Sequence, residues 1–137
     1  MIELEFHVPL SPEETWERLT QGTHILKWWG EDVILEPFKL GKMREQWADM
    51  TGHVRDIEGI VTAFESPRRL QFDYRQTDWQ RQTRVEILIS EQDAGSRLYF
   101  QHSGWEIMAT EADRSREVDA HAEKWEGLFK RFVRYCT

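Results

Sequence analysis

Three side chains in the sequence could transfer protons if the fold brought them together: Glu45, Tyr74 and His102. Each lies in a stretch where apolar and polar residues alternate, as in a half-buried strand, and each falls on the apolar face of its stretch. Burial in an apolar cavity shifts pKa values and permits acid–base chemistry on a carbonyl substrate. His102 is the candidate catalytic residue if the chain is an enzyme. The interpretation that we prefer is a buried imidazole that only hydrogen-bonds a neighbour, because the sequence identifies no partner for proton transfer.

The other residues that carry chemistry form no recognisable site. The five histidines follow no metal-ligand spacing, and neither an HxH nor an HxxxH pair occurs. No Gly-rich phosphate loop and no GxSxG elbow is present. The single cysteine, Cys136, stands next to the C-terminus and cannot form a disulfide within the chain. We therefore expect no metal, no cofactor and a reducing, cytoplasmic location.

Composition limits the classes of protein and partner. The 137 residues are enough for one domain with one core, and the 12% aromatic content concentrates apolar burial in a few large rings. The net charge is −7, and no basic run exceeds Arg68-Arg69, so nucleic acid is not an expected partner. No apolar run approaches the length of a membrane span, and we expect no membrane insertion.

Hydrophobic periodicity and turn signals predict the elements that position these residues. Alternation indicates a strand over residues 2–8. A helix capped by Ser11 and ended by Gly22 follows, and then a second short helix over 23–29. Six strands come next, over residues 33–37, 43–48, 54–64, 70–75, 83–90 and 97–102. Apolar residues spaced three or four apart predict one long helix over about 113–135.

This order of elements predicts an α+β fold in which a curved antiparallel sheet is wrapped around the long C-terminal helix. The two short helices follow the first strand. The C-terminal helix has a large unshared apolar stripe, so it must cover the concave face of the sheet. Gly127 interrupts this helix, which indicates either the close approach of another backbone or a tolerated defect.

The stretch WERLTQGTHILKWWGED contains three tryptophans. Trp16 shares a helix face with Leu19, which predicts a core position. Trp28 and Trp29 are neighbours, and neighbouring side chains on a helix point about 100° apart. We therefore expect one of the two to pack inward and the other to lie at the surface or at the mouth of a cavity.

Five segments in order carry a family resemblance. They are VPLSPEETWERLTQGTHILKWWGED, LGKMREQW, GIVTAFESPRRLQFDY, TRVEILISEQDAGSRLYFQHSGW and AEKWEGLFKRF. Together they resemble the domain similar to the C-terminal part of the activator of the heat-shock-protein-90 ATPase, within the START-like (SRPBCC) superfamily. Members commonly have Gly directly before the Trp of the last helix, where this chain has Lys124, and residues 107–117 are unusually charged here.

The resemblance implies a single helix-grip domain over residues 1–137, with a cavity between the sheet and the C-terminal helix. In the superfamily such cavities hold lipids, polyketides, hormones or other apolar molecules. We therefore expect an apolar or aromatic small-molecule ligand. From strand parity and the helix stripe, its candidate contacts are Trp28, Trp29, Trp47, Phe72, Tyr74, Phe100, His102, Trp125 and Phe129.

Two other functions remain alternatives. Cyclases and dehydratases of the superfamily work in such cavities, which would make this chain a small enzyme using His102. A co-chaperone-like interaction domain is the other, although in 137 residues we do not expect the family activator's additional N-terminal domain. For assembly we consider a homodimer, because twofold dimers are the commonest soluble oligomers.

Overall fold

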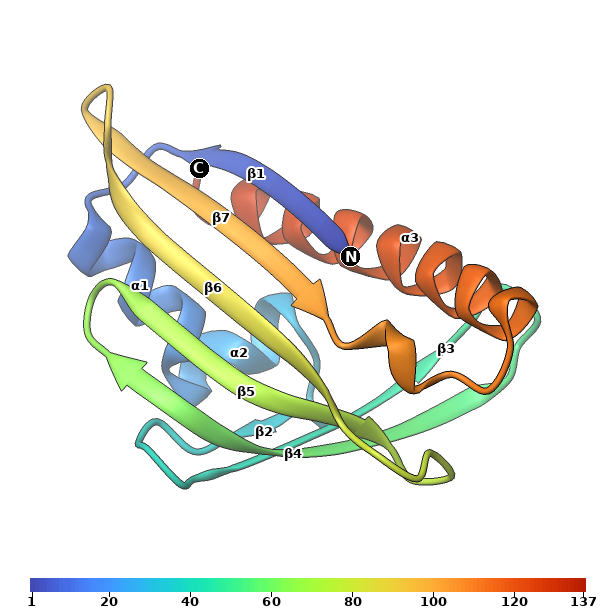
Figure 1. The fold of residues 1–137 in the computed structure, drawn as a ribbon. Helices are drawn as coiled ribbons and strands as arrows, with labels where there is room; N and C mark the ends of the chain where they lie inside the picture. Colours follow the sequence, from blue (N-terminus) through green and yellow to red (C-terminus); the bar gives the residue numbers. More distant parts are fainter.

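Seven antiparallel strands form one curved sheet in the computed structural model, which describes residues 1–137 (Figure 1). Their order across the sheet is β1-β7-β6-β5-β4-β3-β2. The strands are β1 (Ile2–Val8), β2 (Ile34–Leu35), β3 (Lys42–Ala48), β4 (Val54–Glu65), β5 (Arg69–Gln76), β6 (Thr83–Gln92) and β7 (Gly95–Ser103). The predicted α+β helix-grip fold is therefore confirmed.

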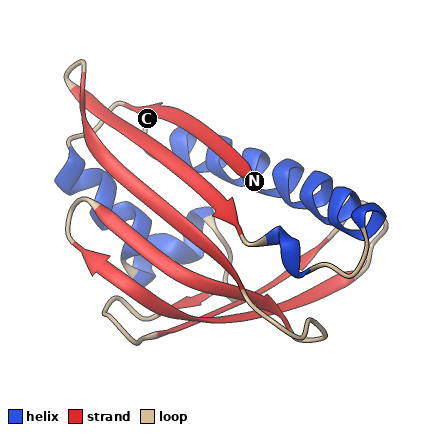
Figure 2. Ribbon diagram, viewed as in Figure 1, coloured by secondary structure: helices blue, strands red, loops and turns tan.

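The helices lie together against one face of this sheet (Figure 2). They are α1 (Pro12–Thr20), α2 (Gly22–Trp28), a short 3-10 helix η1 (Trp105–Ile107) and the long α3 (Glu111–Tyr135). The helix α3 packs against the edge strand β1 and against α2. None of the helices is both long and apolar enough to cross a membrane.

Local signals explain where the helices begin. The Oγ of Ser11 accepts the backbone N–H of Glu14 at 3.2 Å, and Pro12 occupies the first turn of α1. In the same way Thr110 accepts the N–H of Asp113 at 3.0 Å and caps α3. Because Thr110 caps it, α3 begins at Glu111, two residues before the predicted start.

Other boundaries also differ from the prediction. Gly22 begins α2 instead of ending α1, because Gln21 lies between the helices in an extended conformation. The strand β2 has two residues instead of the predicted five, and the chain leaves the sheet before Pro37, which has no backbone N–H to donate. The helix η1 was not foreseen.

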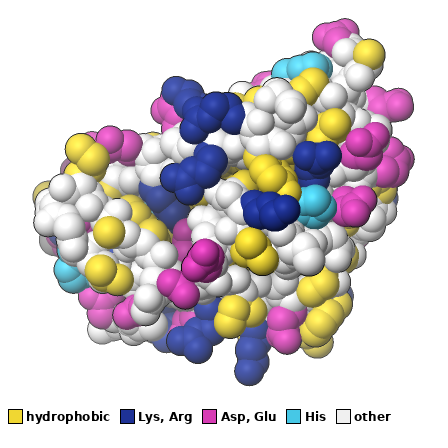
Figure 3. Space-filling view, turned by 180° about the vertical axis from the view of Figure 1, so that it is seen from behind, with side chains coloured by type: hydrophobic (Ala, Val, Ile, Leu, Met, Phe, Trp, Pro, Cys, Tyr) yellow, Lys and Arg dark blue, Asp and Glu magenta, His cyan; other side chains and the backbone are white.

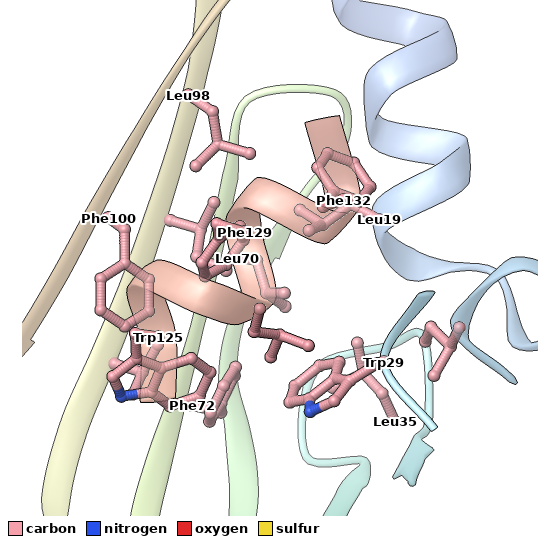
Figure 4. Close-up of a cluster of buried hydrophobic side chains, with 14 of the residues drawn as sticks. Leu19, Trp29, Leu35, Leu70, Phe72, Leu98, Phe100, Trp125, Phe129 and Phe132 are labelled. Atoms are coloured by element: carbon pink, nitrogen blue, oxygen red, sulfur yellow. The ribbon is translucent and has the colours of Figure 1, made fainter. Parts of the chain in front are cut away.

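The core lies between the inner face of the sheet and the helices (Figure 4). Strand parity predicted its sheet side correctly, since Leu70, Phe72 and Tyr74 on β5 and Leu98 and Phe100 on β7 are fully buried. From α3, Trp125 and Phe129 pack onto Phe100, and Phe132 packs edge-on against Phe129. Trp16 and Leu19 of α1 are buried too, as expected.

Both Trp28 and Trp29 are buried, with 1% and 7% of their surfaces exposed, so neither lies at the open surface. Trp29 borders a groove beside α3, which is the cavity-mouth position expected for one of the pair. The end of α2 is enclosed on two sides. Trp28 packs edge-on against Phe132 of α3, and Trp29 contacts Phe72 of β5. Because partners exist in both directions, neighbouring side chains 100° apart can both be covered.

Candidate functional site

A groove of about 860 Å³ opens between β3, the turn that joins β3 to β4, and α3. It lies on the side of α3 away from β1, the edge strand that the helix packs against. The face of the molecule seen in Figure 3 carries Lys and Arg side chains across its centre with hydrophobic side chains beside them. The volume of the groove is within the range of small-molecule sites.

The groove carries balanced charge, although the chain as a whole has a net charge of −7. Basic and acidic residues both line it: Arg55, Arg116, Lys124, Arg131 and Arg134, against Glu45, Asp49, Glu117, Asp119 and Glu123. Its apolar wall includes Trp29, Trp47, Met50 and Leu128. The site therefore combines aromatic surface with a few charged groups, as ligand pockets commonly do.

An ion pair between Lys124 of α3 and Glu45 of β3 closes one part of this groove. Lys124 Nζ lies 2.6 Å from Glu45 Oε1, and the two side chains are only 8% and 3% exposed. The other carboxylate oxygen of Glu45 accepts the indole N–H of Trp29 at 2.7 Å. Both oxygens of this buried carboxylate therefore have a donor, which its burial requires.

Aromatic rings surround the Lys124 ammonium. Nζ lies 3.6 Å from the ring centroid of Trp125 and 5.2 Å from those of Trp47 and Tyr74. Burial lowers the pKa of Lys124 from 10.5 to about 8, and the nearby Glu45 carboxylate offsets part of that effect. Trp47 donates its indole N–H to the Tyr74 hydroxyl at 3.1 Å, which fixes the edge of this aromatic cluster.

A second charged cluster, around Arg55 of β4, lines the end of the groove at the β3–β4 turn. Its guanidinium pairs with Asp49 at 3.0 Å and with Glu117 of α3, and it donates to Gln76 at 3.3 Å. Asp49 also accepts from Thr51, whose hydroxyl lies 2.6 Å away, and these bonds hold its pKa well below the ordinary value. The Arg55 cluster ties the turn to the N-terminal half of α3.

The predicted ligand contacts separate into two groups. Trp29 and Trp47 line the groove. The other seven are in the closed core and do not line it: Trp28, Phe72, Tyr74, Phe100, His102, Trp125 and Phe129. Tyr74 and Trp125 still reach the groove indirectly, because their rings contact Lys124.

His102 is enclosed by hydrogen bonds within the core. Its Nδ1 accepts the indole N–H of Trp125 at 3.1 Å, and its Nε2 lies 2.7 Å from the Thr83 hydroxyl. That hydroxyl donates its proton to the Tyr74 carbonyl at 2.7 Å, so the Nε2–H of a neutral imidazole must donate to Thr83. Burial holds the pKa of His102 well below its ordinary value. The geometry matches the buried, hydrogen-bonded alternative.

The sequence reasoning missed Glu117 and His121 as buried residues and did not place Lys124 in the site. His121 is fully buried, and its Nδ1 donates to the Glu117 carbonyl at 2.8 Å. Positions 117, 121 and 125 follow one another at spacings of four, which continues the stripe of Trp125 toward the start of α3. Because Glu117 and His121 are polar, a search for apolar residues at helical spacing did not include them in the stripe. Lys124 was visible only as a departure from the family pattern.

Gly127 also lines the groove, and its structural role differs from the close backbone approach considered above. A Cβ atom built at this position meets no heavy atom within 4 Å. No group of three or more His, Cys, Asp or Glu residues is placed to hold a metal ion.

Comparisons with known proteins agree with this architecture. A solution structure of the Aha1 dimer from Colwellia psychrerythraea superposes with a TM-score of 0.77 and 15% identity, covering 98% of this chain and 94% of that one. The protein Ms6760 from Mycobacterium smegmatis gives a TM-score of 0.81 at 14% identity, with 98% and 89% covered. Identities this low show the shared fold alone.

A third structure, DynU16, is described as a putative protein in the dynemicin biosynthetic locus. It gives a TM-score of 0.76 at 16% identity, and the match covers 98% of this chain and 46% of that one. A search of curated proteins found no match. The model of the family described as Activator of Hsp90 ATPase homolog 1-like protein matches residues 9–137. Because that match spans nearly the whole sequence, the chain belongs to this family.

Proposed function

We propose that the protein binds a small molecule with an apolar or aromatic body in the groove between β3 and α3. The observation that carries this proposal is the groove itself, which combines about 860 Å³ of space with the indoles of Trp29 and Trp47. A flat ring can stack on such indoles, and such contacts bury a large area. The buried pair of Lys124 and Glu45 supplies the polar contacts that would orient it.

The core beneath the rest of α3 gives less support for a ligand. Phe100, Trp125 and Phe129 contact one another there, with ring centroids 4.8 to 6.1 Å apart. Aromatic side chains of the protein thus occupy the space where the family resemblance implies a deep cavity. The proposed ligand therefore lies nearer the β3 edge than the full set of predicted contacts suggested.

The function can be tested by blocking the groove from Gly127. A Gly127→Trp side chain would start in open space and lean toward the preceding turn of α3, where Lys124 lies. Calorimetry with 2-naphthalenemethanol should show saturable binding to the wild type and to Gly127→Ala, and none to Gly127→Trp. Equal binding to all three variants, or no binding to the wild type, would count against the proposal.

Native mass spectrometry of gently purified protein gives the same proposal a test without a chosen probe. We expect a small mass that is present in the native spectrum and lost on unfolding. Its mass would also define the chemical class of the natural ligand. The same spectrum reports whether the chain is monomeric or dimeric.

We also propose that the chain forms a homodimer through the edge at β2. Ile34, Phe38, Leu40 and Ile60 are all exposed near this edge, and the Colwellia psychrerythraea relative is described as a dimer. Sedimentation velocity should show a dimer for the wild type and a monomer for Phe38→Glu. A wild-type monomer at all accessible concentrations would contradict this.

A further inference from the structure

We propose that Lys124 is a covalent attachment site, whose Nζ condenses with the carbonyl group of an aldehyde or ketone ligand in the groove to form an imine. This inference rests on the proposed function, because the carbonyl compound must first occupy the groove. It adds a chemical class to that ligand: an apolar or aromatic molecule with a reactive carbonyl group.

The amine of Lys124 is open to the groove on one side only. Trp125, Trp47 and Tyr74 cover its aromatic side, with the nearest ring centroid 3.6 Å from Nζ. Lys124 nevertheless lines the groove with Glu45, so a carbonyl carbon can approach from the open side. An aromatic ring attached to that carbonyl could then lie along the indole of Trp29 or Trp47.

Glu45 is placed to move the protons that the reaction requires. The ammonium first gives a proton to Glu45 Oε1, 2.6 Å away, and the neutral amine attacks the carbonyl carbon. The new C–N bond gives a carbinolamine after proton transfer from nitrogen to oxygen. The Glu45 carboxylic acid then protonates the departing hydroxyl, which leaves as water. The product is a protonated imine paired with the Glu45 carboxylate.

The surroundings also favour the reactive form of the amine. Burial lowers the pKa of Lys124 to about 8. At pH 7 about one amine in ten is then neutral, compared with about one in three thousand for an ordinary lysine. A lysine desolvated among apolar groups is a recognised form of activated nucleophile.

The other lysines provide an internal comparison. Lys27, Lys39, Lys42 and Lys130 are all exposed. Lys130 lies on the same helix, with a side chain 61% exposed and an ion pair to Glu126 at 3.1 Å. Like Lys124, Lys130 lies on α3 and pairs with a carboxylate, but no aromatic rings enclose its ammonium group. Lys130→Met is therefore the matched control for Lys124→Met.

The test is to treat the folded protein with 2-naphthaldehyde, reduce any imine with sodium borohydride and map the modified peptide by mass spectrometry. We expect modification of Lys124 to exceed that of each exposed lysine by about tenfold or more near neutral pH, since only the neutral amine attacks. Lys130→Met should keep this adduct and Lys124→Met should lose it. The rate at Lys124 should rise with a midpoint near pH 8.

Modification spread over the exposed lysines, or unchanged in Lys124→Met, would overturn the inference. The wild-type peptide map decides this even if that variant does not fold. The alcohol 2-naphthalenemethanol, which cannot form an imine, separates the two proposals. If the alcohol binds and Lys124 gains no adduct, the imine is rejected and the proposed function stands. If neither occurs, both are rejected.

Discussion

Two neighbouring regions beneath α3, a closed end around His102 and Phe129 and a groove end around Lys124, use similar aromatic residues in opposite ways. Tyr74 and Trp125 contact both His102 and Lys124. Around His102, the rings of Tyr74, Trp105 and Trp125 close on one another, and every polar atom of the imidazole has a partner in the core. Around Lys124, the rings of Trp47 and Tyr74 face a charge pair that borders open space. The closed end stabilises the fold, and the groove end leaves the charged groups of Lys124 and Glu45 within reach of a ligand.

The comparison shows why charge density locates the site better than aromatic content does. Rings alone pack to the density of a core and leave no cavity. At the groove, ion pairs across elements replace apolar contacts: Lys124 to Glu45, and Arg55 to Glu117.

Phe129→Ala should have the largest effect, because it removes a fully buried ring from the closed end. We expect a loss of about 3 to 5 kcal/mol in the free energy of unfolding, from lost burial and an unfilled cavity. Urea unfolding measures this loss directly. Leu26→Ala, which truncates a half-exposed side chain, is the control and should change stability by less than about 1 kcal/mol. Similar losses in both variants would mean that the end around Phe129 is not closed.

Glu45→Gln tests the charge pair at the groove. It leaves the Lys124 ammonium buried without its carboxylate, and we expect a loss of about 3 kcal/mol. The double variant Glu45→Gln/Lys124→Met should recover to within about 1 kcal/mol of the wild type, since it removes both charges. If the double variant is as unstable as the single one, the two residues do not act as a pair.

The pH dependence of stability at alkaline pH should come from the same lysine. Its pKa is about 8 in the folded protein and ordinarily 10.5, so the unfolded chain binds more protons between these values. The free energy of unfolding should therefore rise across this window, by on the order of 3 kcal/mol relative to Lys124→Met. The buried Cys136 thiol, with its pKa raised to about 11, acts in the opposite direction in both proteins and cancels in the comparison. Parallel curves for the two proteins would refute this assignment.

The closed end should respond to acid instead. Burial lowers the pKa of His121 to about 3 and also lowers that of His102. Both imidazoles stay neutral in the folded protein while the unfolded chain takes up protons below pH 6.5. Stability should fall as the pH drops from 6.5 toward 4, with a slope of up to about 3 kcal/mol per pH unit from the two groups. Urea unfolding across this range checks it, and a free energy of unfolding that does not change between pH 6.5 and 4 would contradict the assignment.

Gly127→Ala should have the smallest effect and the opposite sign. Its methyl group meets open space, and alanine favours a helix over glycine, so stability should increase by about 0.5 to 1 kcal/mol. Thermal unfolding can resolve a change of this size. A loss of stability would show that this position is packed and that the groove is narrower than described.

Much of the fold follows from patterns that are local in the sequence. Strand alternation identified the inward faces of β5 and β7, and the spacing of Trp125, Phe129 and Phe132 identified the buried stripe of α3. The boundary at Gly22 was missed because glycine can end one helix or begin another, and only the extended Gln21 decides between them.

The site was less predictable because its contacts join distant residues. Glu45 and Lys124 are 79 positions apart, and Arg55 and Glu117 are 62 apart. No local period connects them. Glu45 was identified from strand parity as a polar residue facing inward, but its partner came from a helix face that reads as charged and solvated. A buried carboxylate predicts that some cation must meet it, without saying which one.

The central claim is that a ligand occupies the groove and not the closed core, and the indole N–H signals of the tryptophans test it most directly. Trp29 and Trp47 line the groove, where their indoles donate to Glu45 and Tyr74. Trp28 and Trp105 donate to core carbonyls of Arg18 and His102. In a ¹H–¹⁵N NMR titration with 2-naphthalenemethanol, the signals of Trp29 and Trp47 should shift most. Shifts confined to Trp28 and Trp105 would contradict the account.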